Sequence, residues 1–439
     1  MITFAIQNNY LSVYFFLTMK KILTYLCAGA LVLSTFSCAK DPWNFTPDNK
    51  KVAPMTPAQV ADNLNDAGVA ALEEANPDFW KDWGQTGLKL VDQFKNVIDT
   101  EDAIEEFADD LEELMSAVAQ QDLYKVTTIT VKLSQVKGDF TVVNDKLVYK
   151  KSENPFNLTY QYAGKTYVLK LEAKDSNNQI IVNSYVNDYD KKKEITILDV
   201  PSMAAIHVTE NGSLYLDLVT YPKINDDDKD GKLGNGDSIE GSATLQIPGY
   251  KLELNSLKAC EDGGSARVAF YHNNKRVLAV DGGVEFDFTA QKESVKSVTR
   301  IFRVVDDTDF NILVADGKAV VKGSIDIQDV RELDESDAET EEEVKQLAAA
   351  MNKACDVNLY FNGNATKQAT LVYLPVQDKT EGYWYYVAGI HFYDGSEDMT
   401  LQEFAKTYVS NFEGVVGKAA SFKTKLTNYF HDLIEKIKD

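Results

Sequence analysis

The feature that most constrains the fold of this chain is a change in hydrophobic periodicity at Tyr124. From there on, segments such as KVTTITVKLS (125–134) and SLYLDLVTY (213–221) alternate apolar with polar residues and are rich in Val, Ile, Thr and Tyr. A period of two in such residues is typical of strands with one buried face. The dipeptide Asp316-Gly317 favours positive φ and predicts a tight hairpin turn. Successive strands joined by short turns indicate an antiparallel sheet or sandwich rather than a parallel doubly wound sheet.

Helical patterns precede and follow these strands. Residues 56–122 are expected to be helical, because Thr56 and Gln59 have capping-box spacing and Asn76-Pro77 interrupts the run. The same Thr-x-x-Glu spacing recurs at Thr340 and Glu343 and at Thr400 and Glu403. The predicted fold class is therefore α+β: a mainly antiparallel β-sheet or sandwich with an N-terminal helical segment and a C-terminal helical segment.

The patterns divide the 439 residues into five segments. These are 1–37 (upstream residues and signal peptide), 38–55 (a tether containing proline), 56–122 (helical), 123–332 (antiparallel β domain with an acidic loop) and 333–439 (an α+β C-terminal segment). A chain of this length can bury a sizeable core without disulfides or metals to hold it together.

The charge of the chain excludes one class of partner. Acidic residues outnumber basic ones by 68 to 45, which gives a formal net charge of -23. Nucleic-acid binding depends on Lys and Arg that displace counterions from phosphates, so we expect no nucleic-acid partner. An acidic surface also repels anionic lipids, so any attachment to a membrane must come from a source other than a basic patch.

The stretch MKKILTYLCAGALVLSTFSCAKD (19–41) supplies such a source. Two lysines precede an apolar run from Ile22 to Leu33, and small residues lead to Cys38. The pattern resembles a bacterial lipoprotein signal, in which signal peptidase II cuts before a cysteine that carries lipid; Thr35 stands where Leu is usual. The resemblance implies a cell-envelope protein held through lipid on Cys38, at the outer membrane and either surface-exposed or periplasmic. The alternatives are a plain signal peptide and an uncleaved anchor.

The cysteines fit an oxidising compartment. Cys27 leaves with the signal and Cys38 carries lipid, so Cys260 and Cys355 remain in the mature chain. The sequence leaves two readings open: a disulfide between Cys260 and Cys355, or two buried free thiols, because spacing alone cannot place two Cα atoms within bonding range.

The acidic stretch NDDDKDGKLGNGDSIE (225–240) predicts a calcium loop between two strands. Its spacing matches D-x-[DN]-x-[DN]-G, and Ca²⁺ prefers six to eight hard oxygens. The expected ligands are the side chains of Asp226, Asp228, Asp230 and Asp237 and the carbonyl of Lys232, with Glu240 as an extra candidate. The loop resembles the EF-hand and dockerin type, but Asp237 replaces the usual Glu and strands flank it. We therefore expect a structural ion, with an empty solvated loop as the alternative.

Signatures of catalysis are sparse. The four histidines form no pair at metal-ligand spacing, and no nucleophile elbow, phosphate loop or dinucleotide fingerprint occurs. Gly236-Asp237-Ser238 is similar to a hydrolase motif, but it closes an acidic loop and lacks the late Asp-x-x-His of that family. No catalytic residue is predicted, although paired carboxylates can arise anywhere among so many acids.

The aromatic stretch GYWYYVAGIHFY (382–393) is the best candidate for ligand recognition. Alternation places Trp384, Tyr386, Ile390 and Phe392 on one face and Tyr383, Tyr385, His391 and Tyr393 on the other. If a helix covers only the first face, the tyrosines of the second can stack on a ligand such as a sugar. The alternative is a strand buried between two layers.

The sequence favours a lipid-anchored cell-envelope protein with a non-enzymatic binding or scaffold role toward a glycan or protein ligand. Two other classes stay open. A carrier of apolar ligands, or an outer-membrane assembly factor, would have an elongated internal groove lined by Val, Leu and Phe. A glycan-active hydrolase would have two carboxylates that face each other across a cleft.

Overall fold

The fold was taken from a computed structural model, which describes residues 52–76, 79, 120–122, 126–143, 146–176, 178–186, 193–226, 236–260, 263–286, 305–334, 338, 340–422 and 424–425. These residues belong to two compact units. The first unit contains the described residues from 120 to 248, and the second contains 52–79 together with those from 249 onward. This division differs from the segments expected from the sequence, because it cuts the predicted β domain and joins the N-terminal helix to the C-terminal strands.

The described strands of the first unit are β1 (Gln120–Asp122), β2 (Val126–Lys132), β3 (Lys137–Val143), β4 (Lys146–Pro155), β5 (Asn157–Tyr162), β6 (Lys165–Lys174), β7 (Asn178–Val186), β8 (Lys193–Val200), β9 (Met203–Glu210), β10 (Ser213–Asn225) and β11 (Ser238–Ile247). They form a four-stranded sheet in the order β1-β2-β8-β7 and a run in the order β11-β10-β9-β6-β5-β3-β4. The pairs β2–β8 and β3–β5 are parallel, whereas the other pairs recorded within this unit are antiparallel. The expectation of helix up to residue 122 is wrong at its end, since β1 pairs with β2 there.

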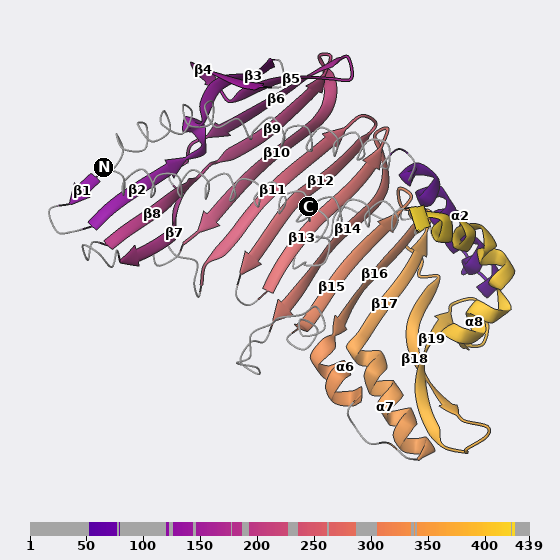
Figure 1. The fold of residues 1–439 in the computed structure, drawn as a ribbon. Coiled ribbons are helices and arrows are strands. Elements are labelled where there is room, and N and C mark those ends of the chain that lie inside the picture. Colours follow the sequence, from indigo (N-terminus) through magenta and orange to yellow (C-terminus); the bar gives the residue numbers. More distant parts are fainter. Residues whose placement is uncertain are drawn as a thin grey trace. The chain divides into compact units, whose positions relative to one another are not determined.

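The strands of the second unit are β12 (Tyr250–Cys260), β13 (Gly263–His272), β14 (Lys275–Phe286), β15 (Val305–Val314), β16 (Ala319–Asp326), β17 (Cys355–Phe361), β18 (Ala369–Gln377), β19 (Trp384–Phe392) and β20 (Met399–Thr400). Each strand pairs antiparallel with the next one along the chain, as Figure 1 shows for β13 to β19. The mainly antiparallel architecture is thus confirmed. Asp316 and Gly317 have positive φ in the β15–β16 hairpin, as expected, but its loop spans four residues rather than two.

The described helices include α2 (Pro57–Ala75), α6 (Ile327–Asp334), α7 (Glu341–Ala354) and α8 (Leu401–Thr407), with short 3₁₀ turns η2 (Leu133–Gln135) and η3 (Val409–Phe412), and residues 413–422 are also helical. All three predicted capping boxes are present at the N-termini of α2, α7 and α8. Within the described part of the chain, no helix has the length and apolar character needed to cross a membrane.

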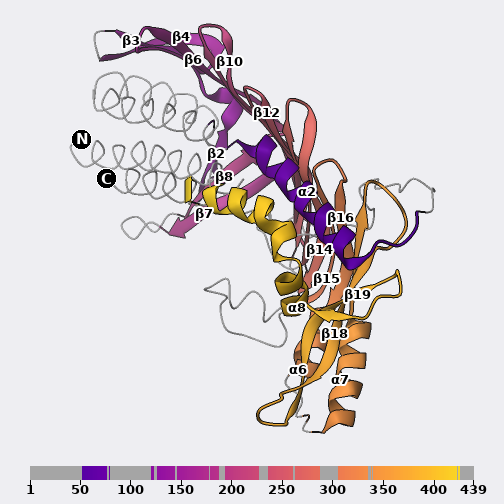
Figure 2. The same ribbon diagram turned by 90° about the vertical axis from the view of Figure 1, so that its right-hand side faces the viewer.

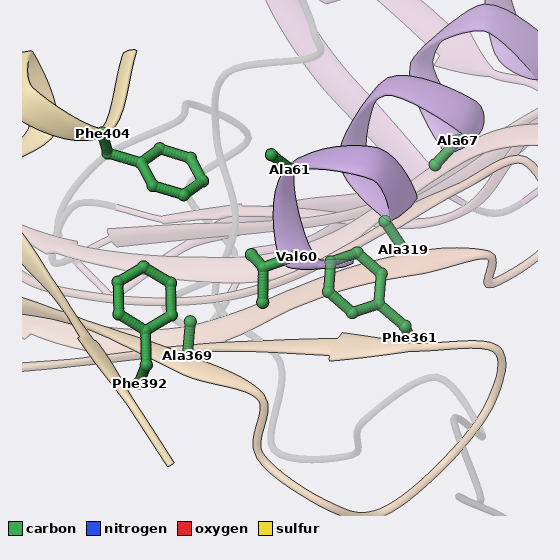
Figure 3. Close-up of a cluster of buried hydrophobic side chains, with 8 residues drawn as sticks. All are labelled: Val60, Ala61, Ala67, Ala319, Phe361, Ala369, Phe392 and Phe404. Carbon is green, nitrogen blue, oxygen red and sulfur yellow. The ribbon is translucent and has the colours of Figure 1, made fainter. Parts of the chain in front are cut away.

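Helix α2 packs on one face of the sheet of the second unit. Val60 and Ala61 of this helix meet Phe361 of β17 and Phe392 of β19, and Phe404 of α8 completes the cluster (Figure 3). Figure 2 shows α2 alongside β14 and β16. Among the described residues of this unit, a helix therefore occupies the position that a second sheet would take in a sandwich.

The opposite face of this sheet, which we call the polar face, carries a row of polar side chains across the strands. In an antiparallel sheet, residues directly opposite each other point to the same side. The register places Arg267, Asp281, Asn311, Lys322, Asn358, Thr370 and His391 opposite one another on successive strands from β13 to β19. The register thereby gathers groups that lie far apart in the sequence.

The disulfide expected as one alternative is not formed. Cys260 and Cys355 are both free; Cys355 is buried and Cys260 is half-buried. Cys260 ends β12 and Cys355 begins β17, and four strands of the same sheet lie between them. At about 4.8 Å per strand the two sulfurs are about 24 Å apart, far beyond disulfide reach. Burial, and to a lesser degree the charge of Asp356, raises the pKa of the Cys355 thiol.

Candidate functional site

Strand β19 has the two faces that its alternation predicts. Phe392 and Ile390 pack into the cluster beneath α2. On the polar face, Tyr383, Tyr385 and Tyr393 expose 54%, 38% and 38% of their surface. Exposed aromatic rings offer apolar surface that a stacking ligand can cover, so this side of β19 is available for binding.

The first group on this surface, the tyrosine pair, consists of Tyr383 and Tyr385. Their ring centroids lie 5.7 Å apart at an interplanar angle of 48°. The two side chains leave the same face because they are two residues apart in an extended segment. They present adjacent aromatic surfaces at the end of β19 that follows the β18–β19 turn.

The turn that carries the tyrosine pair is held by Asp378. Its carboxylate accepts hydrogen bonds from the backbone N–H groups of Thr380 at 2.7 Å and Glu381 at 2.9 Å. These bonds, that from Glu381 first, lower the pKa of the Asp378 carboxyl because they favour its charged form. The backbone N–H of Asp378 also donates to the carbonyl of Tyr383 at 2.9 Å. The hydrogen bonds of the turn therefore fix the backbone of Tyr383.

The second group, the histidine cluster, consists of His391, Tyr393, Asp398 and Thr370. The hydroxyl of Tyr393 lies 2.7 Å from Thr370 Oγ1, which donates to Asn358 Oδ1 at 2.8 Å. Asn358 is only 4% exposed. A chain of bonds that ends on a buried amide holds the Tyr393 ring in one orientation while its face stays in water.

His391 lies beside that ring. Its Nδ1 is 2.7 Å from Asp398 Oδ1, and its ring meets the Tyr393 ring edge-on at 5.0 Å between centroids. Because an ionised carboxylate only accepts hydrogen bonds, Nδ1 carries the proton in this pair. In the neutral ring, Nε2 is then an acceptor.

The loop after β19 positions Asp398. The Asp394 carboxylate accepts from the backbone N–H of Ser396 at 3.0 Å and from its hydroxyl at 2.8 Å. The backbone bond and then the hydroxyl bond lower the pKa of Asp394. Gly395, with φ of 89°, allows the tight turn between them. The loop therefore brings Asp398 back to His391.

The three tyrosines predicted to bind ligand are not gathered in one place. Tyr383 and Tyr385 are neighbours, whereas Tyr393 lies at the other end of β19, about 26 Å from Tyr385 at roughly 3.3 Å per residue. Sequence reasoning missed Thr370, Asn358 and Asp398 as neighbours of Tyr393. The register of β17, β18 and β19 brings Asn358 and Thr370 there, and no local pattern encodes that register.

Only part of the predicted calcium loop is described. Asp228, Asp230 and Lys232 lie outside the described residues. The β10–β11 register ends at the pair of Asn225 and Ser238, so Asp226 and Asp237 are the next residues along the chain, at the two ends of the loop. Asp237 is buried, whereas Glu240 lies in an ion pair with Lys223 at 3.0 Å. In the described ranges, no three His, Cys, Asp or Glu side chains are close enough to hold a metal.

The remaining described histidines pair with carboxylates from neighbouring elements. His207 of β9 lies 2.5 Å from Asp217 of β10, and His272 of β13 lies 2.5 Å from Glu74 of α2. His272 also stacks on Tyr250 at 4.4 Å. The contact of His272 with Glu74 joins α2 to the sheet, and the contact of His207 with Asp217 joins β9 to β10.

A scan against protein-family models finds no match to this chain, and comparisons with curated proteins and with solved structures find none.

Proposed function

We propose that this chain is a lipid-anchored cell-envelope protein with a non-enzymatic binding role, and that the tyrosine pair binds carbohydrate. The observation that carries the proposal is the exposure of Tyr383 and Tyr385 on the face of β19 opposite its core contacts. Exposed aromatic side chains that lie side by side in one patch mark an interaction site more often than single exposed residues do.

The geometry of the tyrosine pair suits a sugar. A pyranose offers a patch of C–H groups on one face and hydroxyls at its rim. Two adjacent phenol rings offer flat apolar area with a polar hydroxyl at each tip. The Asp378 turn fixes the backbone of Tyr383, which reduces the entropy that binding would otherwise cost.

The charge of the chain narrows the class of sugar. A net charge of -23 repels polyanions at a distance, so a neutral polysaccharide is favoured over an acidic one. The same argument disfavours a phosphate-rich ligand.

The anchor and the calcium loop complete the proposal. Lipid on Cys38 and the proline-containing tether 38–55 would hold the binding unit at the outer membrane. Calcium between Asp226 and Asp237 would stiffen the acidic β10–β11 connection. The position of these two aspartates next to the last paired residues of β10 and β11 supports this, because the first and last ligands of such a loop must converge on one ion.

Affinity gel electrophoresis with embedded neutral polysaccharides (dextran, mannan, laminarin and xyloglucan) tests the binding. We expect at least one polymer to retard the protein and Tyr383→Ala with Tyr385→Ala together to remove most of that retardation. Tyr221→Ala is the matched control, since Tyr221 is 53% exposed on β10 in the other unit. Unretarded migration in all four polymers, or equal retardation of all variants, would contradict the proposal.

A further inference from the structure

We infer that the histidine cluster is a second carbohydrate site, separate from the tyrosine pair, which binds one neutral sugar residue on the Tyr393 ring with a pair of its hydroxyls at His391 and Asp398. The inference deepens the proposed function and rests on it for the class of ligand.

The Tyr393 ring is a fixed aromatic platform. Tyr393 is exposed, yet its hydroxyl lies 2.7 Å from Thr370 Oγ1 and thus is tied to the sheet. An exposed tyrosine without such a bond would move between rotamers and would lose that freedom on binding. The bond means that this part of the entropy has already been lost in the free protein.

Polar atoms with free acceptor capacity lie next to this platform. The side chains of His391 and Asp398 are both exposed, and their mutual bond uses only Nδ1 and Oδ1. His391 Nε2 and Asp398 Oδ2 can therefore accept hydrogen bonds from a ligand. Two adjacent sugar hydroxyls are donors at a spacing that suits two neighbouring acceptors. An apolar ligand would leave both acceptors dehydrated and unpaired.

The charges beside the platform also select the ligand. His391 pairs with Asp398, and Lys367 lies 3.6 Å from Asp356, so each carboxylate beside the platform has a cationic or hydrogen-bonding partner. Asn358 Nδ2 also donates to Asp356 Oδ1 at 2.8 Å. With His391 neutral, the carboxylates of Asp356 and Asp398 outnumber the single cation Lys367, so an anionic ligand is repelled from this site, whereas hydroxyl donors find free acceptors there. A neutral polyhydroxylated ligand fits best.

The histidine cluster and the tyrosine pair lie at opposite ends of β19. The length of β19 puts about 26 Å between Tyr385 and Tyr393, so one monosaccharide cannot touch both. The two groups must act as independent sites toward small sugars, and the effects of their substitutions should add.

The test uses small probes and the full-length protein. Saturation-transfer difference NMR with methyl α-mannoside, methyl β-glucoside and methyl β-galactoside reports binding to each variant. In the variant with Tyr383→Ala and Tyr385→Ala we expect residual binding, which Tyr393→Ala or His391→Ala reduces about tenfold or more in affinity. Tyr393→Phe keeps the ring and loses the bond to Thr370, so its binding should fall less than that of Tyr393→Ala. On addition of the bound glycoside, the ¹³Cε1 signal of His391 should shift and that of His207 should not.

The outcomes separate this inference from the proposed function. Residual binding that Tyr393→Ala removes supports the second site. If removal of the tyrosine pair abolishes all binding, the second site is refuted and the proposed function stands. If the wild-type protein binds none of the glycosides but binds a polysaccharide through the tyrosine pair, the second site is again refuted. If the wild type binds neither glycosides nor polymers, both fail. Near-UV circular dichroism of every variant confirms that it is folded.

Discussion

Replacement of Thr370 by Val should break the chain of hydrogen bonds beneath Tyr393 with little change of shape. Val has the same branching as Thr and an equal preference for strands, so β18 should keep its pairing. The change removes the donor to Asn358 Oδ1, at 2.8 Å, and the partner of the Tyr393 hydroxyl, at 2.7 Å. The two lost bonds have unequal costs.

The larger cost falls on Asn358. With 4% of its surface exposed, Asn358 cannot replace the lost donor with bulk water, and an unsatisfied buried acceptor costs about 1–3 kcal/mol. The Tyr393 hydroxyl is near solvent and regains a water molecule, so its share should be close to zero. The expected loss in free energy of unfolding is therefore about 1–3 kcal/mol, which corresponds to about 2–4 °C in Tm per kcal/mol for a unit of this size.

Guanidinium denaturation followed by tyrosine fluorescence measures the loss, with Thr370→Ser as the control that keeps the hydroxyl. Thr370→Val should unfold at lower denaturant than Thr370→Ser, and glycoside binding at the histidine cluster should weaken in Thr370→Val alone. A Thr370→Val protein as stable as the wild type, or less affected than Thr370→Ser, would show that the chain of bonds does not hold the ring.

Three further predictions concern the core, the turn and the ion. Phe361→Ala should lower the free energy of unfolding by about 3–5 kcal/mol, because Phe361 is 1% exposed beneath α2; urea denaturation measures this, and Phe361→Leu should cost less than half as much. Since the pKa of Asp378 is lowered below its ordinary 3.8, its stabilisation of the turn is complete above that value and is lost as the pH falls through the lower pKa of the folded state; NMR of the Glu381 amide against pH should show this transition, and its persistence in Asp378→Asn would contradict the assignment. Calcium should raise Tm relative to a chelator in the wild type, and the combined change of Asp226→Asn and Asp237→Asn should remove the difference; equal Tm values in calcium and chelator would eliminate the site.

Several features of the fold follow from short stretches of sequence. The capping boxes at Thr56, Thr340 and Thr400 begin helices as expected, because each needs only a side chain and a backbone N–H three residues away. Strand alternation likewise predicted which residues of β19 share a face. Both depend on contacts or geometry within a few residues.

The expectations that failed depended on distant parts of the chain. A disulfide between Cys260 and Cys355 was plausible from their number and compartment, but the order of strands keeps β12 and β17 apart. Local patterns also could not predict that residues 52–79 and those from 249 onward belong to one compact unit, in which the Met55 N–H donates to Gln368 Oε1 at 2.7 Å, next to the start of β18.

The candidate site shows the same contrast. The sequence by itself determined that Tyr383, Tyr385 and Tyr393 lie on one face of a strand. In an extended backbone, successive side chains point to opposite faces, so residues an even number of positions apart share a face. Only the tertiary structure decided that Thr370 and Asn358 lie beneath Tyr393 and that Asp398 meets His391. Those neighbours depend on strand register, which is set by the sum of many weak contacts across the whole sheet.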